Sequence, residues 1–174
     1  TVTMFNSIIN QRTKESINLS KVLAEINNNF VNTQKNNKDK LSNEGFDGLI
    51  FKLNENNKSL SFVSAKTPLF IKRENGKVDE YSGTRKTVGY KKDVVFYEET
   101  VDLFKNDIII LTTDGIFDQN NSANKIYSKK RMISIIEKGE SNTDFLVQKI
   151  LSDLENFKGQ MAQRDDITII AFQV

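Results

Sequence analysis

The sequence predicts an α+β protein in which antiparallel strands pack against helices. Three observations predict this fold: helical periodicity near the N-terminus, short apolar runs separated by turn residues in the middle, and a final strand, helix, helix and strand. Strands joined by short turns pair antiparallel, and the helices then cover a face of the sheet. The length of 174 residues suits a single domain over residues 1–174.

Two helical patterns open the chain. The first consists of apolar residues at helical spacing, namely Met4, Phe5, Ile8 and Ile9. The second is predicted from about Ser20 to Phe30, with Ser20 as its N-cap residue. Its apolar face is formed by Leu19, Val22, Leu23, Ile26 and Phe30. Residues 32–45 are polar and lack periodicity, so they are predicted to form a loop.

The middle of the chain predicts two β-hairpins. Residues 46–53 and 60–65 are apolar runs joined by the turn signal NENN. Residues 68–72 and 77–81 are joined by the turn RENG. The chain's one proline, Pro68, stands at the start of its strand, where a missing N–H is tolerated.

A loop, two strands and an irregular segment are predicted next. Residues 83–92 are rich in glycine and basic side chains and lack periodicity, which indicates a loop. Residues 93–103 alternate weakly and suit an edge strand. Residues 108–114 predict a buried strand that ends on an acid, and residues 119–125 an irregular segment.

Two helices and a strand complete the fold. The first helix is marked by Met132, Ile133, Ile135 and Ile136. It is predicted to end at Gly139, and the second helix to begin at a capping box of Ser141 and Asp144. Residues 165–174 are dominated by β-branched side chains, which predicts a central strand.

The composition excludes several kinds of chemistry. The chain contains no Cys and no His, so disulfides, Cys-based zinc sites, thiol nucleophiles and imidazole bases are all absent. Oxygen ligands remain, and these suit Mg²⁺ or Mn²⁺ better than zinc. With 25 basic and 23 acidic residues the net charge is +2, so nucleic acid is not an expected partner. No apolar run reaches the roughly 18 residues of a membrane span, so this segment is not expected to contact a membrane.

Two acidic segments are the candidates for chemistry. The run ILTTDG places Asp114 at the end of one predicted strand, and RDDITII places Asp165 and Asp166 at the start of another. If these strands are antiparallel neighbours, the carboxylates converge at one rim of the sheet and repel unless a cation lies between them. Each motif has a simpler interpretation, because Asp-Gly is common in turns and paired acids often begin exposed strands.

Together these motifs resemble those of the bacterial metal-dependent (2C-type, PPM superfamily) serine/threonine protein phosphatases, in the branch of the sporulation stage II E phosphatase. DIIILTTDGIFDQ and the terminal RDDITIIAF resemble the second half of that domain. NLSKVLAEINNNF resembles the helix that precedes the family's hairpins. SAKTPLFI stands in the place of the family's Ala-Gly-rich stretch before Pro-Leu, and GTRKTVGY resembles the family's short glycine-bearing loop. The resemblance spans most of the chain and implies a portion of an αββα sandwich.

The resemblance also implies a site. In that family two Mg²⁺ or Mn²⁺ ions activate a water that attacks the phosphoester, so the catalytic group is a metal-bound water and not a side chain. Metal ligands would be Asp114 and Asp165, with Asp166, Gly115 and Asp118 supporting them. Asp47 has a weaker claim. Arg85 and Lys86 are candidate contacts for the substrate phosphate, although a solvated loop is the simpler interpretation of these two residues.

The sequence departs from the family in one respect. The family's N-terminal strands and its first metal motif, an early Asp-Gly, have no counterpart here, and Asp47-Gly48 begins a different hairpin. The missing segment is expected upstream of Thr1, which makes this chain the C-terminal portion of the domain. The fragment alone is therefore expected to be inactive, and its exposed strand edges suggest a homodimer.

The resemblance implies a cytoplasmic signalling phosphatase whose parent chain carries an upstream sensor domain and an N-terminal membrane anchor. The expected substrate is a phosphorylated regulatory protein such as an anti-sigma-factor antagonist. Two alternatives remain at this point. One is a degenerate, non-catalytic phosphatase-like domain used for signalling or dimerisation, and the other is an unrelated α+β binding domain whose acids are surface turns.

Overall fold

The described structure divides into two compact units. The computed structural model describes residues 17–36, 45–54 and 58–174. One unit consists of Thr1–Thr67 with Ser82–Asp102, and the other of Pro68–Tyr81 with Leu103–Val174. The helix predicted around residues 4–9 lies outside the described residues. No described helix combines the length and apolarity that crossing a membrane requires.

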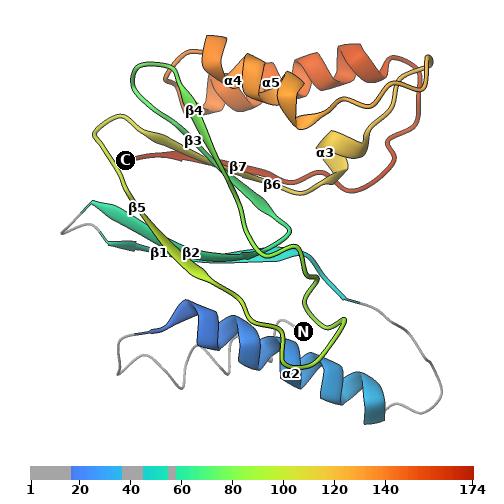
Figure 1. Cartoon of the computed structure of the whole chain (residues 1–174). Helices are drawn as coiled ribbons and strands as arrows, with labels where there is room; N and C mark the ends of the chain where they lie inside the picture. Colours follow the sequence, from blue (N-terminus) through green and yellow to red (C-terminus); the bar gives the residue numbers. More distant parts are fainter. Residues whose placement is uncertain (1–16, 37–44, 55–57) are drawn as a thin grey trace. The chain divides into compact units, whose positions relative to one another are not determined.

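The first unit is an antiparallel sheet with one described helix packed on it (Figure 1). Its strands are β1 (Gly48–Asn54), β2 (Ser59–Ala65) and β5 (Glu98–Asp102), in the order β1-β2-β5. The helix is α2 (Leu19–Asn36). Its apolar face and the sheet share a core whose buried members are Leu19, Val22, Leu23, Ile26, Val63, Ala65, Val88 and Phe96.

A fully buried asparagine holds the loop that precedes β5. The side chain of Asn27 in α2 accepts a hydrogen bond from the Gly89 amide (2.8 Å) and donates one to the Lys91 carbonyl (2.8 Å). Gly89 has φ +90°, and its missing side chain leaves room for the ring of Phe30. The predicted loop at residues 83–92 is therefore confirmed, and its backbone is fixed by α2.

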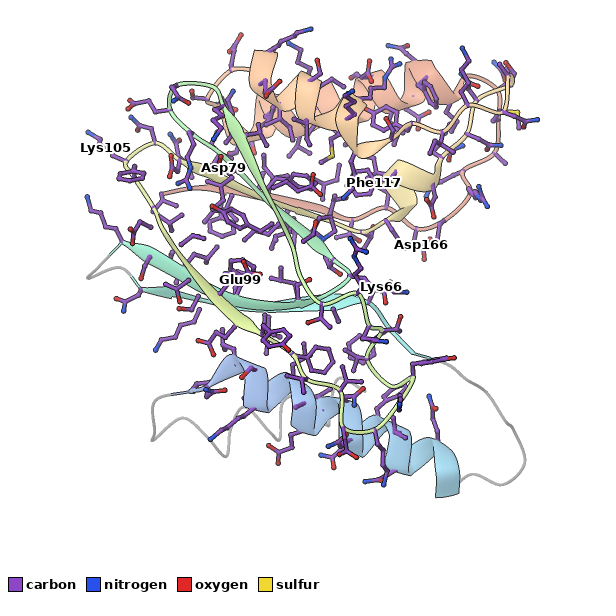
Figure 2. The ribbon with its side chains drawn as sticks, viewed as in Figure 1. Lys66, Asp79, Glu99, Lys105, Phe117 and Asp166 are labelled. Carbon is purple, nitrogen blue, oxygen red and sulfur yellow. The ribbon has the colours of Figure 1, made fainter. Side chains whose placement is uncertain are left out.

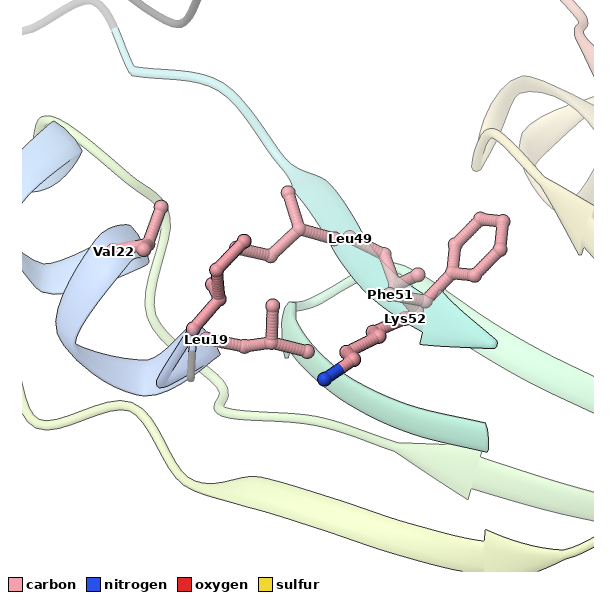
Figure 3. Close-up of a pocket in the computed structure, with 7 residues that line it drawn as sticks. Leu19, Val22, Leu49, Phe51 and Lys52 are labelled. Atoms are coloured by element: carbon pink, nitrogen blue, oxygen red, sulfur yellow. The ribbon is translucent and has the colours of Figure 1, made fainter. Parts of the chain in front are cut away.

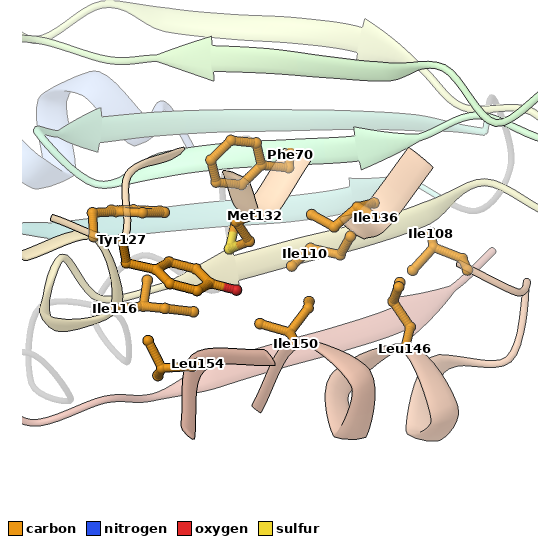
Figure 4. Close-up of a cluster of buried hydrophobic side chains, with 11 residues drawn as sticks. Phe70, Ile108, Ile110, Ile116, Tyr127, Met132, Ile136, Leu146, Ile150 and Leu154 are labelled. Carbon is orange, nitrogen blue, oxygen red and sulfur yellow. The ribbon is translucent and has the colours of Figure 1, made fainter. Parts of the chain in front are cut away.

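The second unit contains a four-stranded antiparallel sheet in the order β4-β3-β6-β7. The strands are β3 (Pro68–Lys72), β4 (Val78–Ser82), β6 (Ile108–Thr112) and β7 (Ile169–Gln173). The helices are α3 (Gly115–Asp118), α4 (Lys129–Lys138) and α5 (Thr143–Lys158). Side chains from β6 and these helices meet in one core (Figure 4), whose buried members are Phe70, Ile108, Ile110, Ile116, Phe117, Tyr127, Met132, Ile136, Leu146, Ile150 and Leu154.

Two arginine clusters support this unit. Arg131 of α4 bonds Asp153 of α5 through two hydrogen bonds (2.7 and 2.9 Å), which lower the pKa of that carboxyl. Its guanidinium also lies over the rings of Phe157 and Tyr127.

The second cluster lies at the turn before β6. Asp107 is 1% exposed there, and Arg73 compensates its buried charge, with Arg73 Nη1 2.6 Å from Asp107 Oδ2.

Most predicted elements are confirmed, including both hairpins, the strand after residue 107, and the two helices. The prediction of a central strand at the C-terminus is wrong, because β7 lies at the edge of its sheet among the described strands. The strand predicted at residues 93–103 is regular only over Glu98–Asp102. Helix α2 continues to Asn36, into the predicted loop, whose residues 37–44 lie outside the described part.

Both predicted helix caps are wrong by one or two residues. The side chain of Asn18, not Ser20, accepts the hydrogen bond from the Lys21 amide (2.9 Å) at the start of α2. At the start of α5 the Asn142 side chain accepts from Phe145 N (2.9 Å), so Ser141 is not the cap. Asparagine and serine are equally good caps, and their neighbouring positions made the sequence ambiguous.

A pair of glycine substitutions separates steric overlap from backbone strain. Gly89 and Gly76 have nearly the same φ, +90° and +87°, but an added Cβ would lie 2.3 Å from the Phe30 ring at Gly89 and 3.4 Å from its nearest neighbour at Gly76. Gly76→Ala should cost about 1–2 kcal/mol of unfolding free energy through its positive φ. Gly89→Ala should cost about 1–3 kcal/mol more because of the overlap. Urea denaturation followed by circular dichroism measures both, and equal losses would contradict the packing described here.

Candidate functional site

The pairing of β6 with β7 brings the two acidic segments together. The strands are antiparallel, with Thr112 opposite Ile169 at the end of the ladder. One residue further on, the Thr113 amide donates to the Thr168 carbonyl (3.1 Å). The chain that leaves β6 at Asp114 therefore lies beside the chain that enters β7 from Asp165 and Asp166. The predicted antiparallel neighbourhood of these two strands is confirmed.

Gly115 is the point of closest approach between the segments. A Cβ on Gly115 would lie 2.5 Å from the carbonyl oxygen of Asp166 and 3.3 Å from the Cβ of Asp165. Gly115 is the first residue of α3 and is not one of the glycines with positive φ. The position therefore requires glycine for space and not for turn geometry, which argues against reading Asp114-Gly115 as an ordinary turn.

The side chain of Thr113 adds a second link between the segments. Its hydroxyl donates a hydrogen bond to the Asp166 carbonyl (3.1 Å) and accepts one from the Thr168 amide (3.0 Å). Both partners flank the entry to β7, so the backbone that follows Asp165 is tied to the end of β6. Nothing in the sequence pattern singled out this threonine, because the partners are distant in sequence.

The carboxylates themselves are exposed at this end of the sheet. Asp114 precedes α3, but its side chain makes no hydrogen bond to the first turn of that helix. Asp165 Oδ1 accepts a hydrogen bond from the Asp166 amide (2.7 Å), which orients the carboxylate. No described lysine or arginine forms an ion pair with Asp114 or Asp165. Figure 2 shows Asp166 close to the short helix that carries Phe117.

The donor set fits part of a site for a hard divalent cation. Two exposed carboxylates stand on neighbouring segments at one end of the sheet, and carboxylate oxygens are the ligands that Mg²⁺ and Mn²⁺ prefer. Within the described ranges, however, no group of three or more acids, histidines or cysteines could hold a metal ion. Asp114 and Asp165 would thus supply one side of such a centre.

The remaining predicted residues lie in different places. Asp118 is exposed at the end of α3, in the same unit as Asp114, and its backbone carbonyl accepts a hydrogen bond from Arg164 (3.4 Å). Asp47 belongs to the first unit and forms an ion pair with Lys66 (3.7 Å). Arg85 and Lys86 are exposed on the loop of the first unit, whereas the two aspartates belong to the second unit.

A separate cavity in the first unit does not resemble a metal site. It has a volume of about 400 Å³ and lies between α2 and the edge strand β1 (Figure 3). Its walls are Ile17, Leu19, Val22 and residues 49–52. Lys52 is the charged residue in this lining, which contains no acid, so the cavity offers no ligands to a divalent cation.

One buried side chain at the candidate site was not expected from the sequence. Gln119 follows α3 and is 0% exposed. Its side chain contacts the backbone of the segment that precedes Asp165, at Ala162 and Arg164. Sequence patterns give no signal for such a contact, because the partners lie more than 40 positions away.

Comparison with known families identifies the family of the chain. The model of the stage II sporulation protein E (SpoIIE) family matches residues 1–174. The chain belongs to the SpoIIE family. A search of curated proteins finds no match.

Solved structures share the fold of this SpoIIE-family chain. The SiaA PP2C domain of Pseudomonas aeruginosa has a TM-score of 0.75 at 22% identity over 98% of this chain and 65% of that one. The PP2C phosphatase domain of SpoIIE from Bacillus subtilis, with a fragment of its regulatory domain, has a TM-score of 0.77 at 15% identity. The match covers 99% of this chain and 48% of that one. RsbX in complex with magnesium has a TM-score of 0.64 at 17% identity, over 98% of this chain and 71% of that one.

These comparisons confirm two predictions. The family is the SpoIIE branch of the 2C-type phosphatases, and the fold is α+β with antiparallel sheets flanked by helices, as in the PP2C domains. The chain spans 65% and 48% of the lengths of the first two structures. By family and by fold, it is a PP2C-like domain.

The close approach at Gly115 can be tested by one added methyl group. In Gly115→Ala the Cβ would overlap the Asp166 carbonyl, so the entry to β7 has to shift and stability should fall by about 1–3 kcal/mol. Amide hydrogen exchange should accelerate at Thr113 and Thr168. Gly48→Ala is the matched control, because its Cβ would make an ordinary 3.4 Å contact with the Phe46 ring. Unchanged exchange at Thr168 in Gly115→Ala would contradict the packing of the two segments.

Proposed function

We propose that this chain is part of a phosphoprotein phosphatase that hydrolyses phosphoserine or phosphothreonine in a bacterial signalling protein. The observation that carries the proposal is the adjacency of the segments that carry Asp114 and Asp165 at one end of the β6–β7 pair, in a chain of the SpoIIE family. The absence of His and Cys agrees with it, because hydrolysis by a metal-activated water requires neither residue.

Two Mg²⁺ or Mn²⁺ ions are the proposed cofactors of the complete centre. Support comes from the oxygen-only ligands of this chain and from RsbX, whose structure is a complex with magnesium. When bound, the ions would supply a water of lowered pKa as the nucleophile. Asp114 and Asp165 are the proposed ligands in this chain. Asp166 and Gly115 would hold the two segments in register, and Asp118 would support α3.

The charge balance indicates that this polypeptide does not hold the complete centre alone. Two divalent cations about 4 Å apart repel by roughly 17 kcal/mol at an effective dielectric constant of about 20. The two aspartates offset only half of the combined charge of the ions. The centre therefore needs further ligands, and we propose that the polypeptide of residues 1–174 does not supply them and has negligible phosphatase activity.

The proposed substrate is a phosphorylated regulatory protein such as an anti-sigma-factor antagonist. This part of the proposal rests on family analogy. Arg85 and Lys86, both exposed on the loop before β5, are the proposed contacts for the substrate phosphate. A sensor domain in the parent chain, a cytoplasmic location and pairing with a second copy through a strand edge belong to the same proposal.

A non-catalytic role is the second candidate function. The observation in its favour is that the described residues contain no group of three acids able to hold a metal ion. A degenerate PP2C-like domain of this kind would act through signalling contacts or dimerisation. The parent gene separates the two candidates, because the enzyme requires an additional Asp-Gly strand and the degenerate domain does not.

Activity of the polypeptide tests the charge argument. Residues 1–174 incubated with a phosphoserine peptide and Mn²⁺ should release phosphate at the rate of a blank, because two carboxylates do not neutralise a binuclear centre. Malachite-green detection of phosphate measures the release. The same reaction with EDTA in place of Mn²⁺ is the control, and release that depends on Mn²⁺ would contradict the prediction.

Binding of a single Mn²⁺ ion tests the two proposed ligands directly. Mn²⁺ should broaden the amide NMR signals of Gly115 and Asp166, because a paramagnetic ion held by Asp114 and Asp165 lies close to both. Asp114→Asn or Asp165→Asn should raise the Mn²⁺ concentration at half-broadening by about tenfold or more, since each removes a charged ligand. Asp144→Asn changes an exposed acid of α5 in the same unit and should leave the Mn²⁺ concentration at half-broadening unchanged. Equal broadening in all three variants would refute the assignment.

A further inference from the structure

Gln119 makes a set of hydrogen bonds that the proposed chemistry has not used. It is 0% exposed and follows directly after α3. The side-chain nitrogen donates to the carbonyls of Asn120 (2.9 Å) and Ala162 (3.1 Å), and the side-chain oxygen accepts from the Arg164 amide (3.1 Å). Both protons and one lone pair of the carboxamide are therefore engaged.

These bonds hold the backbone immediately before Asp165. Residues 161–166 are exposed and form no regular strand or helix, so their conformation depends on individual contacts. On the C-terminal side of Asp165, Thr113 and Gly115 contact Asp166. On the N-terminal side, Gln119 contacts Ala162 and Arg164. The proposed ligand is thus held on both sides by groups that belong to the segment around Asp114.

We propose that Gln119 is a positioning residue that sets Asp165 at a fixed distance from Asp114 for cation binding. The inference rests on the proposed function, because it assigns Gln119 to the metal site proposed there. Two ligands held in place before binding lose less conformational freedom when the ion arrives, so affinity rises without a new contact to the ion. Gln119 does not touch the ion in this scheme; it acts through the backbone of residues 162–164.

The chemistry of the carboxamide fits this task. A glutamine bonds a carbonyl and an amide at the same time and carries no charge into a buried position. A cationic residue at that position would pair with the carboxylates that the ion needs, and an anionic one would add to their repulsion. The neutral amide fixes the loop and leaves the charge of Asp114 and Asp165 available.

Asn27 in the first unit provides a matched control. It is also 0% exposed, and its carboxamide also bonds one backbone amide and one backbone carbonyl of a loop, at Gly89 and Lys91. Gln119→Met and Asn27→Leu remove these bonds at nearly constant volume. Both variants should therefore lower the melting temperature, whereas only Gln119→Met changes the backbone beside Asp165.

The experiment measures Mn²⁺ binding and hydrogen exchange on the whole chain of residues 1–174. In Gln119→Met the Mn²⁺ concentration that half-broadens the Gly115 and Asp166 amide signals should rise by about three- to tenfold, as expected when a preorganising contact is lost. Exchange of the Arg164 amide should accelerate. In Asn27→Leu the Mn²⁺ concentration at half-broadening and the exchange rate of the Arg164 amide should equal those of the wild type, whereas the Gly89 amide should exchange faster.

The outcomes separate this inference from the proposed function. Wild-type Mn²⁺ affinity in Gln119→Met, alongside specific broadening in the wild type, would overturn the role of Gln119 and leave the metal site standing. No broadening at Gly115 and Asp166 in the wild type would overturn the metal site and this inference with it. If Gln119→Met does not fold, Gln119→Asn takes its place, because the shorter amide cannot reach both Ala162 and Arg164; unchanged Mn²⁺ affinity in that variant would overturn the inference equally.

Discussion

The antiparallel pairing of β6 with β7 is the constraint on which the candidate site depends. Side chains of β6 are buried along most of the strand, and Ile108 and Ile110 belong to the core formed with α4 and α5. In β7, Ile169 and Ala171 pack against this core whereas Ile170 is exposed, so a slip of one residue would turn the core-facing side chains of β7 to solvent, and the core fixes the register. The same register decides where the chain leaves β6 and enters β7. Core packing therefore determines that the segments carrying Asp114 and Asp165 lie side by side.

Neutral groups supply several links between the two acidic segments, namely a hydroxyl at Thr113, a close backbone approach at Gly115 and a carboxamide at Gln119. A charged group adds another, because the Arg164 guanidinium donates a hydrogen bond to the Asp118 carbonyl (3.4 Å). Elsewhere in this unit buried or half-buried acids are paired with arginine, as Asp107 is with Arg73. Among the described residues no lysine or arginine forms an ion pair with Asp114 or Asp165, so the proposed cation would not have to displace one.

Local sequence patterns predicted most of the helices and strands. The features that they did not predict depend on contacts between residues far apart in the chain. The hairpins followed from apolar runs separated by turn residues, because pairing of strands joined by a short turn is a local property. The β6–β7 neighbourhood entered the sequence argument only as a condition, since α3, α4 and α5 separate the two strands. The edge position of β7 did not follow, since a β-branched run looks alike at an edge and at the centre of a sheet. The role of Gln119 was equally hidden, because a polar residue after α3 has no periodicity that marks it as buried.

The residues proposed for metal binding and for phosphate binding differ in how their surroundings hold them. A loop segment without ladder bonds keeps one conformation only when its backbone groups find other partners. Asn27 supplies them to Gly89 and Lys91, and Gln119 supplies them to the residues directly before Asp165. The backbone beside Arg85 and Lys86 is also held, because Thr84 is hydrogen-bonded to Ser64 and Lys66, and Val88 to Phe46. Asp165 has in addition a carboxylate that the Asp166 amide orients (2.7 Å), so the proposed metal site has the more direct structural support.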